Sequence, residues 1–218
     1  MRKDTFFKNS FFLTASNITT GILGFIFSMY LGNIAGPEGL AVYGLVMPVY
    51  NLFICLMTAG IIAAISQRSA IYESTGEYNN LFKTINTVAF FNIIWSIIIG
   101  ILVFFLAPYI SKYGIKDPRT LNAIRVTCPA MVFIALSNIL KGFFYGTSRI
   151  TVPAIIDISE KAMRIITITL LIFIFKAQTL SSIVTLAFVS LAIGELQSLL
   201  LLYAYFKYTK RHMPLGHD

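Results

Sequence analysis

Residues 9–37 form a run of 29 residues without a single charged side chain. A helix needs about 20 apolar residues to cross the hydrocarbon core of a bilayer, so this run is long enough to span it. A cleaved signal peptide has a shorter apolar core followed by a small-residue cleavage site, and this run has neither, which indicates a retained span. Only 12% of the 218 residues are charged and 57% are hydrophobic. Soluble domains carry about 25% charged residues, so we predict an integral membrane protein.

Further apolar segments predict an all-α fold, a polytopic membrane bundle of six transmembrane helices. The segments are too long and too uniformly apolar for the alternating strands of a membrane barrel. The predicted spans are 11–34, 42–65, 84–110, 121–142, 152–175 and 179–206, followed by a cytoplasmic tail over 207–218. The fifth span is unusual, because only residues 165–175 of it are free of charge.

The distribution of lysine and arginine between the predicted loops indicates the orientation. Cytoplasmic loops of membrane proteins carry an excess of these residues. One side of the predicted bundle has ten of them, at positions 2, 3, 8, 68, 83, 141, 149, 207, 210 and 211, and the other has five, at 112, 116, 119, 125 and 176. We therefore expect a plasma-membrane protein whose two termini both lie in the cytoplasm. The net charge of +8 fits this bias and contact with anionic membrane lipids, and it does not indicate nucleic-acid binding.

The most informative charges lie at the start of the fifth predicted span. Asp157, Glu160, Lys161 and Arg164 follow the i, i+3, i+4, i+7 pattern and share one helix face. The spacing predicts that Asp157 pairs with Lys161, and Glu160 with Arg164. Each ionised residue at mid-membrane costs about 2.5–3.5 kcal/mol, so this face must avoid lipid.

Two interpretations of this charged face remain open. In the first, the span begins near Ser159 and the charges form a solvated cytoplasmic helix end. In the second, they line a cavity for a charged substrate, and Glu195, alone between two uncharged runs in the sixth span, favours this arrangement. Glu195 would otherwise pair with Arg164 or Lys161 inside the bundle. Asn17 and Asn138, each beside hydroxyl residues, add to a polar interior.

Glycine and proline residues mark predicted hinges and close helix contacts. Pro48 lies inside the second span and is expected to kink it, whereas Pro153 is expected to open the fifth helix. Gly24, and the Gly142 and Gly146 pair with its small-xxx-small spacing, are assigned to helix packing.

Catalytic and metal-binding patterns are poor in this sequence. His212 and His217 lie in the charged tail without a cysteine nearby, which predicts no metal site. No phosphate-binding glycine loop and no cluster of a nucleophile with histidine and carboxylate is recognisable. We expect neither enzymatic activity nor a cofactor.

Several short motifs, in this order and spacing, resemble the stage V sporulation protein B family. They occupy residues 13–25, 36–40, 43–44, 48–50, 58–61 and 64–66, and then the pattern G-x-x-x-G, P, E-x-x-x-R at Gly142, Gly146, Pro153, Glu160 and Arg164. That family comprises polysaccharide-transport members of the MATE-like multidrug/oligosaccharidyl-lipid/polysaccharide exporter superfamily. Relatives usually carry arginine at two first-helix positions that read Gly21 and Ser28 here.

The resemblance implies a flippase that moves a lipid-linked oligosaccharide, a polysaccharide or a cell-wall precursor across the membrane by alternating access. It also implies two six-helix lobes, of which this chain is the first, with a second copy or a separate chain as the second. In such a protein Arg164 and Lys161 would attract a phosphate. Asp157, Glu160 or Glu195 would hold these cations or carry a coupling proton or cation.

Two other functions stay open at the level of the sequence. The first is a cation-coupled exporter of small amphipathic molecules from the same superfamily. The second is a membrane scaffold or truncated remnant that transports nothing.

Overall fold

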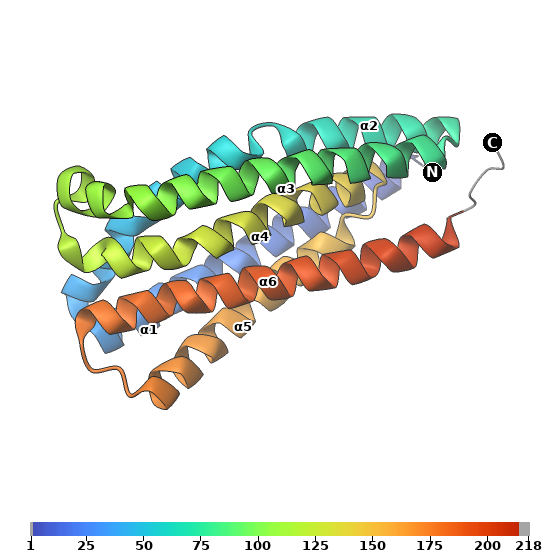
Figure 1. Cartoon of the computed structure of the whole chain (residues 1–218). Coiled ribbons are helices and arrows are strands. Elements are labelled where there is room, and N and C mark those ends of the chain that lie inside the picture. Colours follow the sequence, from blue (N-terminus) through green and yellow to red (C-terminus); the bar gives the residue numbers. More distant parts are fainter. Residues whose placement is uncertain (1, 214–218) are drawn as a thin grey trace.

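The computed structural model describes residues 2–213, with side chains from residue 7 onward, and it is helical throughout these residues except for short connections. The α-helices are α1 (Arg2–Thr58), α2 (Ile61–Thr75), α3 (Tyr78–Tyr109), α4 (Leu121–Gly146), α5 (Thr151–Phe175) and α6 (Leu180–His212). A π-helical turn (Ile110–Ile115) and a 3-10 turn (Pro118–Thr120) connect α3 to α4. The start of α1 and the end of α6 lie at the same end of an elongated bundle (Figure 1). The central element is α4, which packs against α6, α3, α2 and α1.

The first 58 residues form two helical segments, as the sequence predicts, but the connection between them is shorter than expected. The two segments of α1 meet at Gly36, whose φ is 72° and ψ 179°. The chain reverses its direction there, so that the second segment runs back along the bundle towards α2 (Figure 1). Pro37 disfavours a helical conformation for the residue before it, and glycine tolerates the positive φ. The predicted loop over 35–41 is therefore too long, because the helical segments meet at the single residue Gly36. Pro48 lies within helical backbone of the second segment, and the kink expected there stays a prediction.

Within the described residues, four segments are long and apolar enough to cross a membrane. They are Phe7–Thr75, Tyr78–Ile115, Pro118–Gly146 and Leu180–His212. α5 is not among these segments, because the charged residues in its first half make it too polar. The predicted count of six separate spans is thus not confirmed. The last helix also continues through residues 207–212, which were predicted as tail, and residues 214–218 lie outside the described part of the chain.

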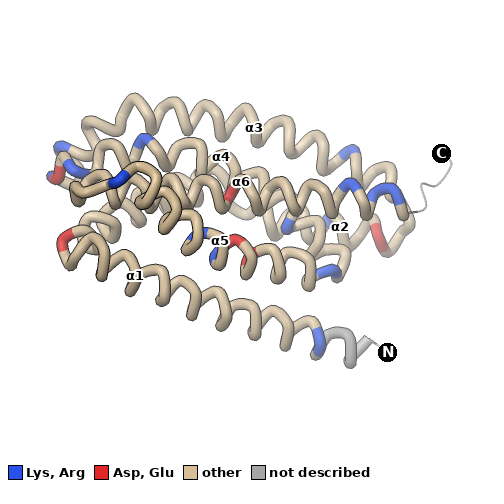
Figure 2. Tube along the Cα trace, turned by 90° about the horizontal axis from the view of Figure 1, so that it is seen from below, with Lys and Arg blue, Asp and Glu red and all other residues tan. Residues whose placement is uncertain are grey.

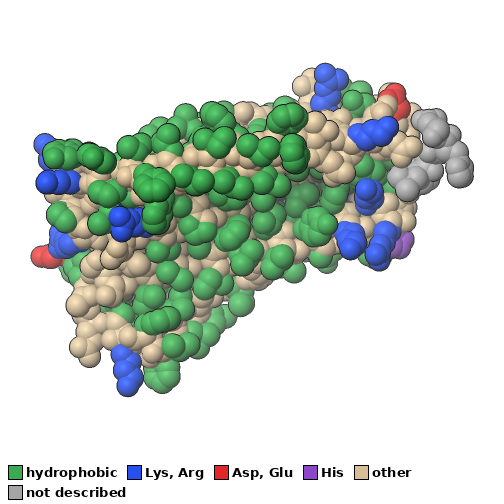
Figure 3. Space-filling model, in the orientation of Figure 1, with side chains coloured by type: hydrophobic (Ala, Val, Ile, Leu, Met, Phe, Trp, Pro, Cys, Tyr) green, Lys and Arg blue, Asp and Glu red, His purple; other side chains and the backbone are tan. Residues whose placement is uncertain are grey.

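Apolar side chains cover much of the length of the bundle on its outer surface. Figure 3 shows them over the face in view, with most lysines and arginines gathered towards the two ends. Figure 2 shows a further group of charged positions on α5 and α6, near the middle of the bundle. An apolar belt between two charged ends is typical of a protein that crosses a bilayer.

Two hydrophobic clusters fill the interior, and a polar layer lies between them. On α4 the first cluster ends at Ala135 and the second begins at Ile139. On α6 the corresponding residues are Ala192 and Leu202. The buried polar residues Ser137, Asn138, Glu195 and Ser198 fall in these two intervals. The fold thereby places a polar site between two apolar layers.

Candidate functional site

A small cavity of about 160 Å³ lies in this polar layer, among α1, α4, α5 and α6. Three carboxylates and two ammonium groups line it, together with hydroxyl, amide and apolar side chains. The lining residues are Ser16, Asn17, Thr20, Ile134, Lys141, Asp157, Glu160, Lys161, Glu195 and Ser198. If all five charged groups are ionised, the lining carries one uncompensated negative charge. Buried charges without compensation are costly, so the cavity favours a proton or a cation.

The ion pairs in the site differ from the predicted pairs within α5. Nζ of Lys141, on α4, lies 2.7 Å from Oδ1 of Asp157, and Nζ of Lys161 lies 2.7 Å from Oε2 of Glu160. The predicted Asp157–Lys161 and Glu160–Arg164 pairs are therefore wrong. Glu195 forms no salt bridge within residues 7–213, so neither of its predicted pairings with Arg164 or Lys161 is formed.

Glu160 and Glu195 are the two buried carboxylates of the site, with 4% and 6% of their surface exposed. Oε1 of Glu160 is buried and has no hydrogen-bond partner in the described part of the chain, and neither does Oγ of Ser198. Native interiors satisfy the large majority of such atoms with protein, water or ions. The two oxygens are therefore free to bind a water molecule or a small cation in the cavity.

Arg164 lies outside the cavity, in a pocket of aromatic rings. Its Nη2 donates a hydrogen bond of 2.6 Å to the hydroxyl of Tyr43, and its guanidinium carbon lies 4.3 Å from the centre of the Phe27 ring. The Tyr43 ring in turn stacks on Phe188. With only 6% of its surface exposed, Arg164 is held by Tyr43 and Phe27 of α1 and does not line the cavity.

The remaining predicted residues divide between the site and the helix contacts. Asn17 lines the cavity, whereas Asn138 is buried nearby without lining it. Gly142 and Gly146 allow α4 to approach α2: a Cβ at 146 would lie 2.6 Å from Cβ of Ser69. Gly24 has no neighbouring atom within 4 Å of a Cβ position.

Pro153 was expected to open the fifth helix. It is the third residue of α5, where a missing N–H is tolerated.

Two tyrosines of α1 lie beside the site; the sequence analysis placed them in motifs of the family resemblance but did not predict them as site residues. Tyr43 holds Arg164, and buried Tyr50 lies within electrostatic range of Glu195, Arg164 and Glu160. The hydroxyl of Tyr50 has no partner in the described residues. The seven-residue spacing of the two tyrosines places them on one helix face, which is the signal that could have found them.

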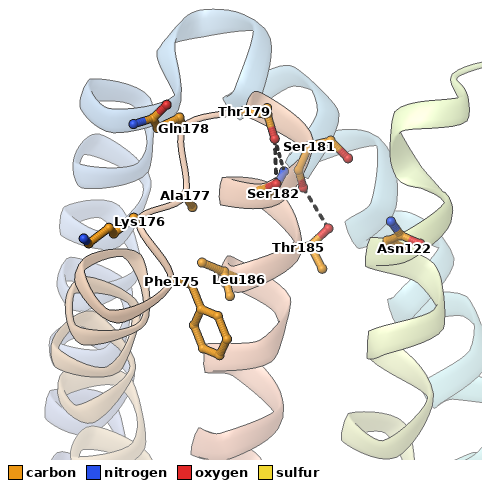
Figure 4. A pocket seen from close by; sticks show the side chains of 10 residues that line it. All are labelled: Asn122, Phe175, Lys176, Ala177, Gln178, Thr179, Ser181, Ser182, Thr185 and Leu186. Carbon is orange, nitrogen blue, oxygen red and sulfur yellow. Dashed lines mark hydrogen bonds between the residues drawn. The ribbon is translucent and has the colours of Figure 1, made fainter.

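A larger cavity of about 500 Å³ lies at the end of the bundle remote from the termini, around the α5–α6 connection (Figure 4). Its hydroxyl groups have partners within α6 and its N-cap: Oγ1 of Thr179 contacts Oγ of Ser182 at 2.6 Å, and Oγ1 of Thr185 donates to the backbone carbonyl of Ser181. Lys176 is the one charged residue in its lining, and it is exposed. The smaller cavity, with five charged groups, is therefore the stronger candidate.

Comparison with known proteins gives matches over nearly the whole chain. A profile described as "Polysaccharide biosynthesis protein" matches residues 6–216. Stage V sporulation protein B of Bacillus subtilis (strain 168) is 29% identical over 210 residues, which cover 96% of this chain and 40% of that protein. Lipid II flippase MurJ of the same organism is 24% identical, over 93% of this chain and 39% of its own length.

A solved structure shares the fold. An outward-facing multidrug resistance MATE family transporter of the MOP superfamily superimposes with a TM-score of 0.74 at 19% sequence identity. The alignment covers 97% of this chain and 46% of the transporter. The chain thus spans about two fifths of the length of the curated relatives that it matches, and nearly half of this transporter.

Proposed function

Because the chain belongs to the polysaccharide biosynthesis protein family within the MOP superfamily, we propose that it is one lobe of a membrane flippase. Its substrate would be a lipid-linked oligosaccharide, a polysaccharide or a cell-wall precursor, moved by alternating access. The single observation that carries this proposal beyond family membership is the charged cavity at mid-bundle. Ionisable groups inside a membrane are expensive and are typical of ion and proton pathways.

The cavity would bind the ion whose gradient drives transport, and it would not bind the transported substrate. Ligand sites for drug-sized molecules measure about 300–1,000 Å³, whereas this cavity is about 160 Å³. A lipid-linked sugar does not fit into it, but a proton or a hydrated monovalent cation does. Glu160 and Glu195 would bind that ion, Lys161 would hold the Glu160 carboxylate in place, and Lys141 would hold that of Asp157. The substrate would then contact the face that this lobe turns to a second lobe.

We further propose that the bundle crosses the membrane six times, with α1 supplying two spans on either side of Gly36 and α5 a polar fifth span. Six crossings return the chain to its starting side, which agrees with the start of α1 and the end of α6 lying at one end of the bundle (Figure 1). The excess of basic residues at that end supports a cytoplasmic location for both termini. A second lobe, from another copy or a separate chain, would complete the transport cavity.

The same coupling site favours one alternative substrate class, small amphipathic cations exported against a gradient. Both functions are tested in proteoliposomes that contain this lobe with its second lobe and either a fluorescent lipid-linked oligosaccharide or a fluorescent cationic drug. We expect gradient-driven flipping of the lipid-linked sugar, and its loss in Glu160→Gln and Glu195→Gln. Glu77→Gln, an exposed carboxylate at the start of α3, is the matched control.

The outcomes of this assay separate the candidate functions. Drug transport without flipping would assign the small-molecule exporter. Flipping that persists in both Glu160→Gln and Glu195→Gln would refute the coupling role while leaving the flippase intact. If neither substrate moves and the purified complex has the mass of a single lobe, the scaffold interpretation replaces the flippase.

A further inference from the structure

Arg125 is a cation on the apolar outer face of the bundle without a counter-charge. It lies four residues after the start of α4, and its guanidinium carbon lies 5.3 Å from the centre of the Phe104 ring on α3. Arg125 forms no ion pair with any residue in the part of the chain that the structure describes. Its Nε is buried and has no hydrogen-bond partner there. Arg125 is partly exposed, so its guanidinium, whose charge no described residue neutralises, is available to an anion from outside the chain.

Next to Arg125 a groove of about 270 Å³ runs between α3 and α4. Its walls are apolar, and Phe104, which contacts Arg125, is one of them. The lining residues are Ile97, Gly100, Ile101, Phe104, Phe105, Cys128, Pro129 and Val132. The two helices are in ordinary contact at Gly100, where a Cβ would lie 3.7 Å from Cγ2 of Val132.

The dimensions of the groove match those of one leaflet. From Ile97 to Phe105 it follows eight residues of α3, a rise of about 12 Å, and half of a hydrocarbon core is about 15 Å. Arg125 lies about 6 Å along α4 from its first residue, at the depth where arginine side chains extend towards the headgroups. The charge of Arg125 therefore lies at the headgroup end of the apolar groove, which opens to lipid.

We propose that this groove binds an anionic phospholipid, with the phosphate on Arg125 and one acyl chain between α3 and α4. The guanidinium offers several donors to phosphate oxygens. Phe104 would pack against the glycerol end of the lipid, and Val132 and Ile97 against the acyl chain. The site is separate from the charged cavity of α5 and α6, so it does not depend on the transport proposal.

Native mass spectrometry of the full chain in detergent tests this site, with phosphatidylglycerol and phosphatidylcholine of identical acyl chains as probes. We expect the wild type to retain phosphatidylglycerol preferentially. Arg125→Gln should weaken this retention about fivefold, the factor that one basic residue at an anionic membrane surface contributes. Arg125→Lys should keep most of it. The Lys176→Gln variant, which loses a cation of the α5–α6 connection, should retain phosphatidylglycerol like the wild type.

A second variant tests the groove without touching the charge. Val132→Phe should fill the channel and lower the retention of both lipids, and helix content measured by circular dichroism shows that each variant is folded. Equal retention of the two lipids by the wild type would overturn the proposal, as would unchanged retention in Arg125→Gln. A dimer without bound lipid that Val132→Phe dissociates would assign the groove to a second copy instead and would also overturn it.

Discussion

The carboxylate of Glu160 occupies the space beside Gly194 on the facing helix. A Cβ atom at position 194 would lie 2.8 Å from Oε1 of Glu160 and 3.3 Å from its Cγ. The absence of a side chain on α6 therefore allows the buried carboxylate to lie between α5 and α6. Oε2 of the same group contacts Lys161.

We predict that Gly194→Ala displaces the Glu160 carboxylate and impairs coupling without unfolding the protein. Replacing glycine by alanine stabilises a helix by about 1 kcal/mol. This gain offsets part of the strain that the close contact with Glu160 creates. The free energy of unfolding should thus change by no more than about 1 kcal/mol. Gradient-driven transport in proteoliposomes should fall strongly, as it should in Glu160→Gln.

Gly44→Ala is the matched control, because no atom lies within 4 Å of a Cβ at that position of α1. It should transport like the wild type. Normal transport by Gly194→Ala would show that the position of the Glu160 carboxylate is not critical.

The charged face of α5 could be predicted from the sequence, whereas its partners could not. The periodicity of Asp157, Glu160, Lys161 and Arg164 requires only a helix, and the cost of burying charge requires that the face avoid lipid. The i, i+4 rule describes the surface of an isolated helix. In the bundle, Lys141 reaches Asp157 from α4 and Tyr43 reaches Arg164 from α1, and these approaches depend on packing.

The break in α1 shows a similar division. Gly36 and Pro37 form a recognised turn signal, so an interruption near this point could be predicted. The length of the interruption could not be predicted, because the apolar pattern of the sequence is the same for a loop of seven residues as for a single residue with positive φ. The backbone resumes its helix at once after Gly36.

The contact between α4 and α2 predicts a steric cost for Gly146→Ala. A Cβ there would lie 2.6 Å from Cβ of Ser69 and 3.0 Å from the backbone carbon of Ser66, and neither can move without moving α2. Overpacking of this kind costs about 1–3 kcal/mol. Thermal unfolding in detergent should show a lower midpoint for this variant. Gly24→Ala, which has open space around it, should unfold at or above the wild-type temperature.

The ion pair between Lys141 and Asp157 predicts non-additive effects on stability. Lys141→Met leaves the Asp157 carboxylate without its partner at 2.7 Å. Because both side chains are only partly exposed, we expect a loss of about 2 kcal/mol. The double variant Lys141→Met/Asp157→Leu should recover much of that loss, since no unpaired charge remains. Additive losses in the double-mutant cycle would contradict a stabilising pair.

The connection between α3 and α4 predicts a dependence on acidic pH. Hydrogen bonds from the Arg119 side chain, at 2.8–3.1 Å, hold the pKa of Asp117 below its ordinary value. Arg119 also reaches Glu38 on α1 at 3.3 Å. A carboxylate with a lowered folded pKa stabilises the fold above its unfolded pKa of about 3.9. That stabilisation is lost as the pH falls through the folded pKa.

The stability deficit of Arg119→Gln relative to the wild type should therefore be constant between about pH 5 and pH 8. Below about pH 4 it should shrink, because Asp117 becomes protonated in both proteins. Unfolding midpoints measured over this pH range give the comparison. Lys116→Gln, on the same connection, should show no such change, and a deficit for Arg119→Gln that grows on acidification would contradict the assignment.

The junction of α1 and α2 predicts a role for two side chains of α3. The break before Ile61, at Gly60 with φ 73°, leaves the last carbonyls of α1 without helical donors. Nδ2 of Asn92 donates to the carbonyl of Met57 at 3.0 Å, and Nε1 of Trp95 donates to that of Leu56 at 3.2 Å. In lipid no water replaces these donors.

Asn92→Leu should lower the free energy of unfolding in mixed micelles by about 0.6–1.7 kcal/mol, the range measured for hydrogen bonds between membrane helices. Trp95→Phe should have a smaller effect, because Trp95 is half exposed while Asn92 is buried. Phe91→Leu, on the exposed side of the same turn, is the control. Amide exchange at residues 59–61 should accelerate in Asn92→Leu. Unchanged exchange there would mean that the junction does not depend on the side-chain donors of α3.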